Sequence, residues 1–223
     1  MQTERNGNCN KRNYQKELEK VLAAGEDTGT VPTLLLHSCC APCSSYVLEY
    51  LASHFHITVY YYNPNIYPPE EYEERTLEVE RLIHELPVRY PVKLIKGEYR
   101  PEAFYEAVKG RESDPEGGER CRICFTERLK EAARVAAGGG YDYFTTTLSI
   151  SPMKDAVLLN EIGEKAGLEY GVTYLNSDFK KKNGYKRSVE LSGQYGLYRQ
   201  DYCGCIFSMR ERKENRPEAD KEK

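Results

Sequence analysis

Residues 33–45 read TLLLHSCCAPCSS, a short apolar run that leads straight into a cysteine-rich turn. The apolar run, Thr33–Ser38, is typical of a buried strand. From Ser44 to His54 the apolar residues recur at helical spacing, which predicts a helix after the turn. The turn itself, Cys39–Cys43, contains three cysteines and no glycine. A strand, a short turn and a helix in this order form the first half of a βαβ unit.

The same alternation continues along the chain. Four more strands are predicted, at Ile57–Asn63, Val92–Tyr99, Tyr141–Thr147 and Val172–Asn176. Helices are predicted between them, at residues 70–86, 101–109, 121–137 and 155–166, and Gly167 is expected to end the last. Strands that alternate with helices of about 10 to 18 residues indicate a parallel sheet. The sequence therefore predicts an α/β fold of three layers, with a five-stranded, mostly parallel sheet and a C-terminal helical segment.

The chain is divided into one domain and two ends. Residues 1–30 are predicted to be an N-terminal extension with one helix over residues 14–24. Cys9 has no other cysteine near it in sequence and is interpreted as a spectator. Residues 31–210 are predicted to form a single domain, as is usual for a chain of 223 residues. Residues 211–223 are highly charged and are predicted to be a disordered tail.

Composition excludes several classes of protein. The chain has 32 basic and 35 acidic residues, so a polybasic coat for nucleic acid is excluded, although a local basic face is not. Eight cysteines are too few for a small disulfide-stapled secreted domain. No apolar run has the length of a membrane span, so we expect no membrane association and a cytoplasmic location. In that compartment, clustered cysteines indicate metal, cluster or redox sites.

Three unusual segments follow predicted strands. They are Cys39–Ser45, Thr147–Lys154 and Asp178–Lys186, after the first, fourth and fifth strands. The carboxyl ends of parallel strands lie along one edge of the sheet, where ligands bind in this class of fold. The sequence therefore predicts a single functional site to which all three segments contribute.

The first cysteine group is Cys39, Cys40 and Cys43. It lies where the helix dipole lowers the pKa of a thiol, and this favours the thiolate form that metals bind. The alternative is a set of small apolar cysteines buried behind the sheet. Three cysteines in five positions make that alternative difficult to accept.

The second group is Cys121 and Cys124, a CxxC motif at a predicted helix start. This motif alone is a weak signal, since zinc knuckles, redox pairs and cluster ligands all use it. Its i, i+3 spacing places both sulfurs on one helical face. Together with Cys39 and Cys40 it would supply four thiolates. The spacing favours an iron–sulfur cluster over zinc, because vicinal cysteines bind different irons readily but would strain to chelate one zinc.

The third group is Cys203-Gly204-Cys205. Cysteines at i, i+2 can form only a distorted disulfide ring, and strained disulfides are more often the labile, catalytic ones. Two alternatives remain open: an unpaired buried pair, or two further metal ligands.

The only basic stretch of the chain begins at Asp178. Residues 178–213 contain nine Lys or Arg against four Asp or Glu, interleaved with tyrosines, which suits an RNA backbone with unstacked bases. The alternative is a solvated face. We interpret the Glu-rich helix over 70–86 as a solvated outer face, and His37 as a hydrogen-bonded core histidine.

Several segments together resemble the cobalamin-independent epoxyqueuosine reductases (QueH). The resemblance covers about Thr33 to Ser208, and the double cysteine and the Cys-Gly-Cys are its specific features. The segments are LLLHSCCAPCSS (34–45), YYYNPNIYPPEEYEER (60–75), CRICFTERL (121–129), FTTTLSISPMKD (144–155) and SDFKKKNGYKRSVELSGQYGLYRQDYCGCIFS (177–208).

This resemblance implies a fold related to the HUP nucleotide-binding superfamily, without use of ATP. It implies reduction of epoxyqueuosine to queuosine at the wobble position of tRNA, with an unidentified electron donor and without cobalamin. It assigns a [4Fe–4S] cluster to four cysteines and a redox-active pair to two more. The cluster ligands are Cys39, Cys40, Cys121 and Cys124, and the redox pair is Cys203 and Cys205.

The family is also expected to hold an iron beside the cluster, for which Cys43 is the candidate ligand. Asp178, Lys180 and Tyr185 are candidate proton donors or substrate contacts. Two rival functions are considered. An ATP-dependent tRNA-modifying enzyme of the HUP superfamily would need a Gly/Ser-rich loop where this chain has Cys39–Ser45. A zinc-stabilised tRNA-binding module would purify colourless and with zinc, not iron and sulfide.

Overall fold

The computed structural model describes residues 12–214, apart from the side chains of residues 26–28. Cys9 and most of the charged tail lie outside the described residues. No helix in this part of the chain is long and apolar enough to cross a membrane. The elements follow one another as α1 (Tyr14–Thr28), β1 (Thr33–Ser38), α2 (Ala41–Leu51), β2 (His56–Tyr61), α3 (Pro69–Glu85), β3 (Lys93–Lys96), α4 (Pro101–Ala107), α5 (Glu119–Gly138), β4 (Tyr143–Thr146), a 3₁₀ turn η1 (Thr147–Ile150), α6 (Ala156–Tyr170), β5 (Thr173–Tyr174), α7 (Gly184–Gln194) and α8 (Ile206–Glu214).

The five strands form one sheet in the order β3-β2-β1-β4-β5, and every neighbouring pair is parallel. The predicted α/β class and five-stranded sheet are therefore confirmed. The order 3-2-1-4-5 is that of a doubly wound, Rossmann-type sheet. It reverses at β1, which pairs with β2 on one side and β4 on the other. Ligands bind such sheets beyond the carboxyl ends of the strands at this reversal. Here the residues at that position are Cys39 and Thr147.

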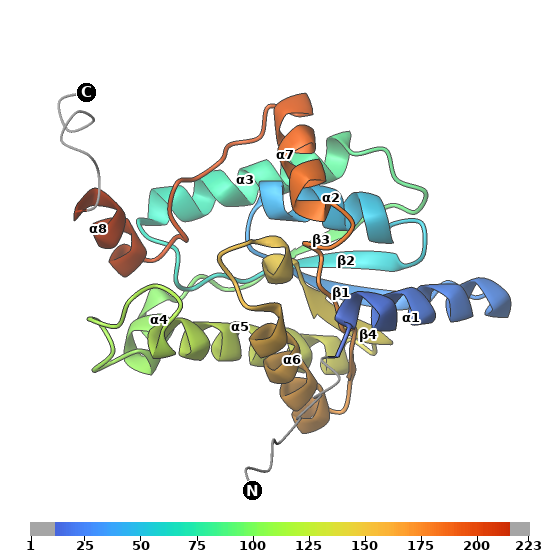
Figure 1. Ribbon diagram of the computed structural model, residues 1–223, viewed down its shortest axis with the longest axis horizontal. Coiled ribbons are helices and arrows are strands. Elements are labelled where there is room, and N and C mark those ends of the chain that lie inside the picture. The colour runs from blue at the N-terminus through green and yellow to red at the C-terminus, as the bar shows by residue number, and fades with distance from the viewer. Residues whose placement is uncertain (1–11, 215–223) are drawn as a thin grey trace, which may run out of the picture.

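Helices cover both faces of the sheet (Figure 1). On one face, Leu34 and Leu36 of β1 share an apolar core with α1, α2 and α3. On the other, Leu35 and Phe144 pack against the alanines of α5 and against α6. Successive side chains of a strand point to opposite faces, so a continuous apolar run such as Leu34–Leu36 suits a sheet that is buried on both sides.

The helix predicted over residues 14–24 is present as α1 and continues to Thr28. It ends at Gly29, whose φ of 67° lies in the left-handed region that glycine tolerates. Leu18 is fully buried in the core that it shares with residues of β1, α2 and α3, so α1 packs on the domain. The C-terminal helical segment is confirmed as α7 and α8.

The predicted end of α6 at Gly167 is wrong. The helix continues to Tyr170 and ends at Gly171, which has a φ of 75°. Gly167 lies inside the helix, where a Cβ would sit 2.6 Å from the carbonyl oxygen of Val172. Glycine is therefore needed there because the chain entering β5 passes directly against the helix, not because the helix ends.

Candidate functional site: a cysteine-lined cavity

A cavity of about 580 Å³ lies at the carboxyl edge of the sheet. The turn after β1, the segment after η1 and the chain between α7 and α8 contribute to its lining, together with residues of α3, α5 and α8. Cys39 and Cys43 come from the first, Lys154 from the second and Cys203 from the third. Two of the three segments predicted to form one site thus meet here, and the Cys-Gly-Cys loop lines the same cavity.

The sulfur atoms of Cys39, Cys40 and Cys43 form a compact group, all within 4.8 Å of one another. Cys40 is the N-cap of α2 in an extended conformation, and a proline in the first helical turn helps to start the helix there. The Sγ atoms of Cys39 and Cys40 are 3.8 Å apart. Thr147 Oγ1 lies 3.3 Å from the Cys39 amide and 3.4 Å from its sulfur, which ties the cysteine turn to the end of β4.

The three thiols differ in acidity although they share one turn. Hydrogen bonds from Cys40 and Cys43 hold the pKa of Cys39 well below its usual range. The same hydrogen bond to Cys39 raises the pKa of Cys40 to about 11, and the pKa of Cys43 also rises. The predicted thiolate is therefore Cys39 alone, because a second negative charge beside it is unfavourable. The other two thiols would release protons on binding a metal.

Cys121 and Cys124 lie on the first turns of α5 and are buried. Burial raises the pKa of both thiols, that of Cys124 to about 11. They do not belong to the compact group formed by the three cysteines of the α2 turn. They instead line a smaller cavity with Cys203 and Cys205.

The Cys203–Cys205 loop lies between the two cavities, since Cys203 lines both. Gly204 has a φ of 127°, and its carbonyl oxygen accepts a hydrogen bond of 2.8 Å from the Tyr67 amide. A Cβ at Gly204 would lie 3.0 Å from Arg75 Nη1, so the glycine permits both the conformation and the close approach. Both cysteines are free thiols here, and their pairing as a disulfide stays a prediction.

The remaining predicted site residues fall into two places. Lys180 donates hydrogen bonds to the Ser149 carbonyl oxygen, at 2.9 Å, and pairs with Asp178 at 3.3 Å. Both residues line a neighbouring cavity that contains no cysteine. Tyr185 lines a small cavity together with Cys40 and Cys43. Of these three residues, only Tyr185 therefore lies beside the thiols.

Two buried arginines of the site escaped prediction. Arg75 lies on α3, where the sequence predicts only a solvated face, yet its side chain is 2% exposed. It pairs with Glu71 at 2.6 Å and donates to the Cys203 carbonyl oxygen at 3.2 Å. Arg128 lies one helical turn after Cys124 and is also buried. The i, i+4 spacing from Cys124 could have indicated Arg128, and both arginines lie in segments that carry the family resemblance, 60–75 and 121–129.

His37 is a core histidine, as predicted. It is fully buried, with Nδ1 2.8 Å from Thr146 Oγ1 and Nε2 3.1 Å from the Tyr62 carbonyl oxygen. Burial and the nearby charge of Arg128 lower its pKa to about 3, so the ring is neutral at physiological pH.

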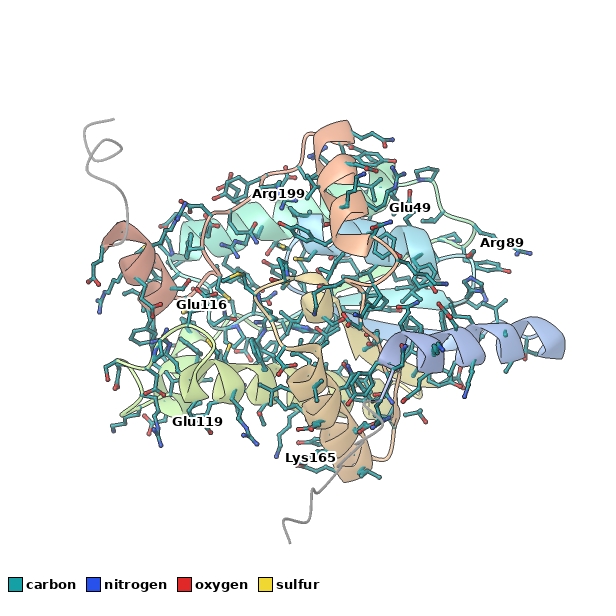
Figure 2. All side chains as sticks on the ribbon, in the orientation of Figure 1. Glu49, Arg89, Glu116, Glu119, Lys165 and Arg199 are labelled. Carbon is teal, nitrogen blue, oxygen red and sulfur yellow. The ribbon has the colours of Figure 1, made fainter. Side chains whose placement is uncertain are left out.

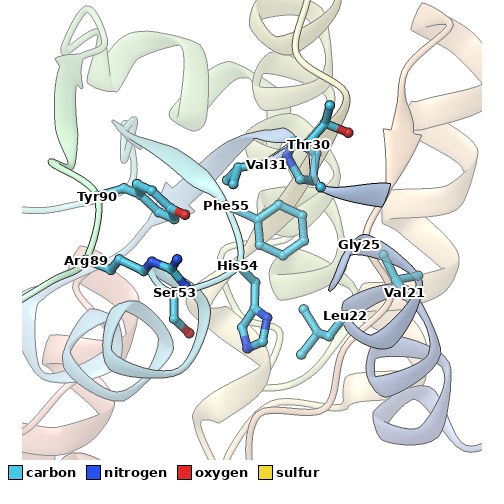
Figure 3. A pocket seen from close by; sticks show the side chains of 12 residues that line it. Val21, Leu22, Gly25, Thr30, Val31, Ser53, His54, Phe55, Arg89 and Tyr90 are labelled. Carbon is cyan, nitrogen blue, oxygen red and sulfur yellow. The ribbon is translucent and has the colours of Figure 1, made fainter. Parts of the chain in front are cut away.

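A different pocket, of about 390 Å³, lies at the amino ends of the strands (Figure 3). Val21, His54 and Arg89 line it, and it contains no cysteine. In Figure 2 Arg89 lies at the far end of the molecule from Glu116, which lines the thiol cavity. The chemistry of the chain is therefore concentrated at the carboxyl edge of the sheet.

The donor set suits a soft metal or an iron–sulfur centre. Thiolates select zinc, copper(I) and iron–sulfur clusters, whereas magnesium and calcium prefer oxygen ligands. Three sulfurs lie in one group, and the two buried cysteines of α5 share a smaller cavity with Cys203. Fold and site together define a Rossmann-type α/β protein with a thiol-rich metal or redox centre.

Comparison with known proteins identifies the family: the chain belongs to the epoxyqueuosine reductase QueH family, whose sequence model matches residues 34–211. An epoxyqueuosine reductase QueH of Staphylococcus epidermidis is 45% identical, over 89% of this chain and 85% of its own. That of Streptococcus pyogenes is 41% identical, over 90% and 79%. That of Thermotoga maritima is 38% identical, over 83% and 95%. A solved structure of a predicted subunit of tRNA methyltransferase from Methanocaldococcus jannaschii matches 72% of this chain and 76% of its own, with a TM-score of 0.41 and 14% identity. This similarity is too low to bear on fold or function.

Proposed function

We propose that this protein is an epoxyqueuosine reductase that acts on tRNA in the cytoplasm. It removes the epoxide oxygen of epoxyqueuosine as water and leaves queuosine. The observation that carries the proposal is the compact group of Cys39, Cys40 and Cys43, which shares one cavity with Cys203 in a chain of this family.

The proposed ligands of a [4Fe–4S] cluster are Cys39, Cys40, Cys121 and Cys124. When bound, such a cluster supplies electrons one at a time. Cys43 is the proposed ligand of an adjacent iron, because it belongs to the compact sulfur group but not to these four. The turn after β1 has no glycine-rich phosphate cradle, so ATP is not part of the proposal, and neither is cobalamin.

Cys203 and Cys205 are the proposed redox pair. Oxidation of two thiols to a disulfide releases two electrons and two protons, and removal of an epoxide oxygen as water consumes the same numbers. Both C–O bonds of the epoxide break, a C=C bond forms between the two carbons, and one S–S bond forms. An electron donor, not yet identified, must then return the disulfide to two thiols.

Only some of the Lys and Arg side chains in the predicted basic stretch are free to bind the phosphates of an RNA substrate. Lys182 pairs with Glu19 and Arg187 with Glu49, at 2.6 Å for the latter, so part of the predicted basic stretch is neutralised. Within residues 12–214, Lys181 and Lys186 pair with no carboxylate and remain available for phosphate contacts. Tyr185, beside the thiols and 39% exposed, is the proposed contact for a base.

The test is anaerobic incubation of reconstituted protein with tRNA that contains epoxyqueuosine, using dithionite as the reductant, followed by mass analysis of the nucleosides. We expect conversion to queuosine, with a mass decrease of one oxygen atom. Cys203→Ser should give no more than a single turnover. A colourless protein that contains zinc and leaves the nucleoside unchanged would support the RNA-binding alternative and contradict the proposal.

A further inference from the structure

Arg128 differs from the other two most deeply buried arginines of the described chain. Arg75 pairs with Glu71, and Arg120 pairs with Glu211 at 2.7 Å. Within residues 12–214 no carboxylate lies within ion-pair distance of Arg128, although its side chain is only 2% exposed. A buried positive charge without a counter-charge is strongly unfavourable. The fold must therefore provide negative charge near Arg128 in another form.

The groups near Arg128 that can take up negative charge are the thiols of cysteines. Its Nη1 atom is 4.0 Å from the sulfur of Cys124, one turn earlier on α5. Burial lowers the pKa of the guanidinium, but the nearby Cys124, Cys39 and Cys203 raise it above its ordinary value. These cysteines come from all three cysteine groups of the site. Arg128 is therefore the fixed positive charge that the three groups have in common.

Arg128 also connects two cysteine-bearing segments mechanically. Its Nη2 atom donates to Asn63 Oδ1, just after β2. The Asn63 amide in turn donates a 2.9 Å hydrogen bond to the carbonyl oxygen of Ser38, the residue before Cys39. A chain of hydrogen bonds thus runs from α5, which bears Cys124, to the start of the cysteine turn.

We propose that Arg128 is a positioning residue that fixes α5 relative to the cysteine turn and supplies the positive charge for a thiolate-ligated centre. The inference relies on the cluster of the proposed function but not on the epoxide as substrate. Its test therefore measures the centre itself.

The test compares Arg128→Met with Arg134→Met. Arg134 lies on the same helix, but its side chain is 59% exposed and pairs with Glu131 at the surface. Iron and sulfide per chain are measured after anaerobic reconstitution, and the reduction potential is measured by redox titration followed by EPR. Circular dichroism checks folding. We expect Arg128→Met to bind the centre about 10- to 100-fold more weakly, as when other supporting residues are removed.

The centre that remains in Arg128→Met should have a more negative reduction potential. Reduction adds negative charge, and the loss of a nearby positive charge makes that less favourable. Arg128→Lys should restore the potential but not the full iron content, since an amine keeps the charge and lacks the planar fork that reaches Asn63. Unchanged iron content and potential in Arg128→Met would overturn the proposal.

Should Arg128→Met fail to fold, Asn63→Asp decides the question. The new carboxylate would neutralise the guanidinium without removing it, so the potential should again become more negative. An unchanged potential in that variant contradicts the proposed role of the charge. If the unmutated protein holds a normal centre and does not reduce the epoxide, that result counts against the proposed function alone.

Discussion

At the scale of single residues, the site is a balance between thiolates and buried guanidinium groups. The pKa of Cys39 is held well below its usual range, and neighbouring cysteines raise the pKa of the buried Arg75 and Arg128 guanidinium groups although burial lowers it. Buried charges of opposite sign require each other, because either one alone is poorly solvated. The arginines therefore belong to the site, although no role was predicted for either of them from the sequence.

Replacing Cys43 separates its role from that of the proposed cluster ligands. Cys43→Ala should abolish turnover and leave the visible absorption of the cluster in place, because Cys43 is not among the four proposed ligands. Cys39→Ala is the matched control and should lose both. Absorption spectra and nucleoside analysis give the two measurements, and unchanged activity in Cys43→Ala would remove this residue from the mechanism.

Replacing Arg75 tests how the Cys203 loop is held. Arg75→Met should destabilise the protein by about 3 kcal/mol, because it leaves the partly buried Glu71 carboxylate without its guanidinium partner. It should also speed alkylation of Cys203, whose carbonyl oxygen loses a donor. Arg81→Met, on the same helix but in surface ion pairs, should change stability by less than about 1 kcal/mol. Urea unfolding measures both variants, and equal effects would contradict the assignment.

At the scale of elements, the close fit of α6 against β5 places the last strand beside β4. Two glycines inside α6 allow this contact, since a Cβ on Gly163 would meet the ring of Tyr174 at 2.4 Å and one on Gly167 would meet a backbone oxygen. The helix therefore keeps residues of low helix propensity because the sheet passes so close.

A pair of glycine substitutions tests this fit. Gly167→Ala should destabilise the protein by about 1 to 3 kcal/mol, because its new Cβ overlaps backbone that cannot move easily. Gly138→Ala, at the end of α5 with nothing within 4 Å, should instead be neutral or stabilise by up to about 1 kcal/mol. Thermal unfolding of both variants distinguishes them, and similar melting temperatures would refute the packing argument.

At the scale of the whole molecule, helices on both faces of the sheet hold the carboxyl edge in place, and α8 is fixed at that edge. Arg120 and Glu211 join α5 to α8, and Ser208 donates to Glu116 at 2.9 Å. At the other end of the chain α1 packs into the larger core. Both ends of the described chain are thus attached to one unit.

The contribution of α1 can be measured with one substitution. Leu18→Ala should cost about 3 kcal/mol, as for other fully buried leucines, and should lower the unfolding midpoint of the whole domain in a single transition. Lys20→Ala, exposed on the same helix, should have an effect of less than about 0.5 kcal/mol. A separate low-stability transition for α1, with the main one unchanged, would show that residues 1–30 are an independent extension.

Local sequence patterns predict most of the strands and helices but not the tertiary contacts between them. The apolar run Thr33–Ser38 coincides with β1 because a strand buried on both faces has a continuous apolar signature. The prediction that α6 ends at Gly167 is wrong, because a glycine needed for packing resembles one that ends a helix. On α3, Leu77 is 61% exposed and Arg75 is buried, the reverse of what their polarity predicts.

The amino-acid sequence by itself determined the order of strands and helices, the cysteine turn after β1 and the family, because these depend on residue types at short spacings. Tertiary structure alone decided which cysteines are neighbours. It brings Cys203 and Cys205 beside the cysteines of α5, places Cys203 between the cavities, and separates Lys180 from the thiols. The physical reason is that burial and charge pairing arise between segments far apart in the chain, and only the folded sheet edge brings those segments together.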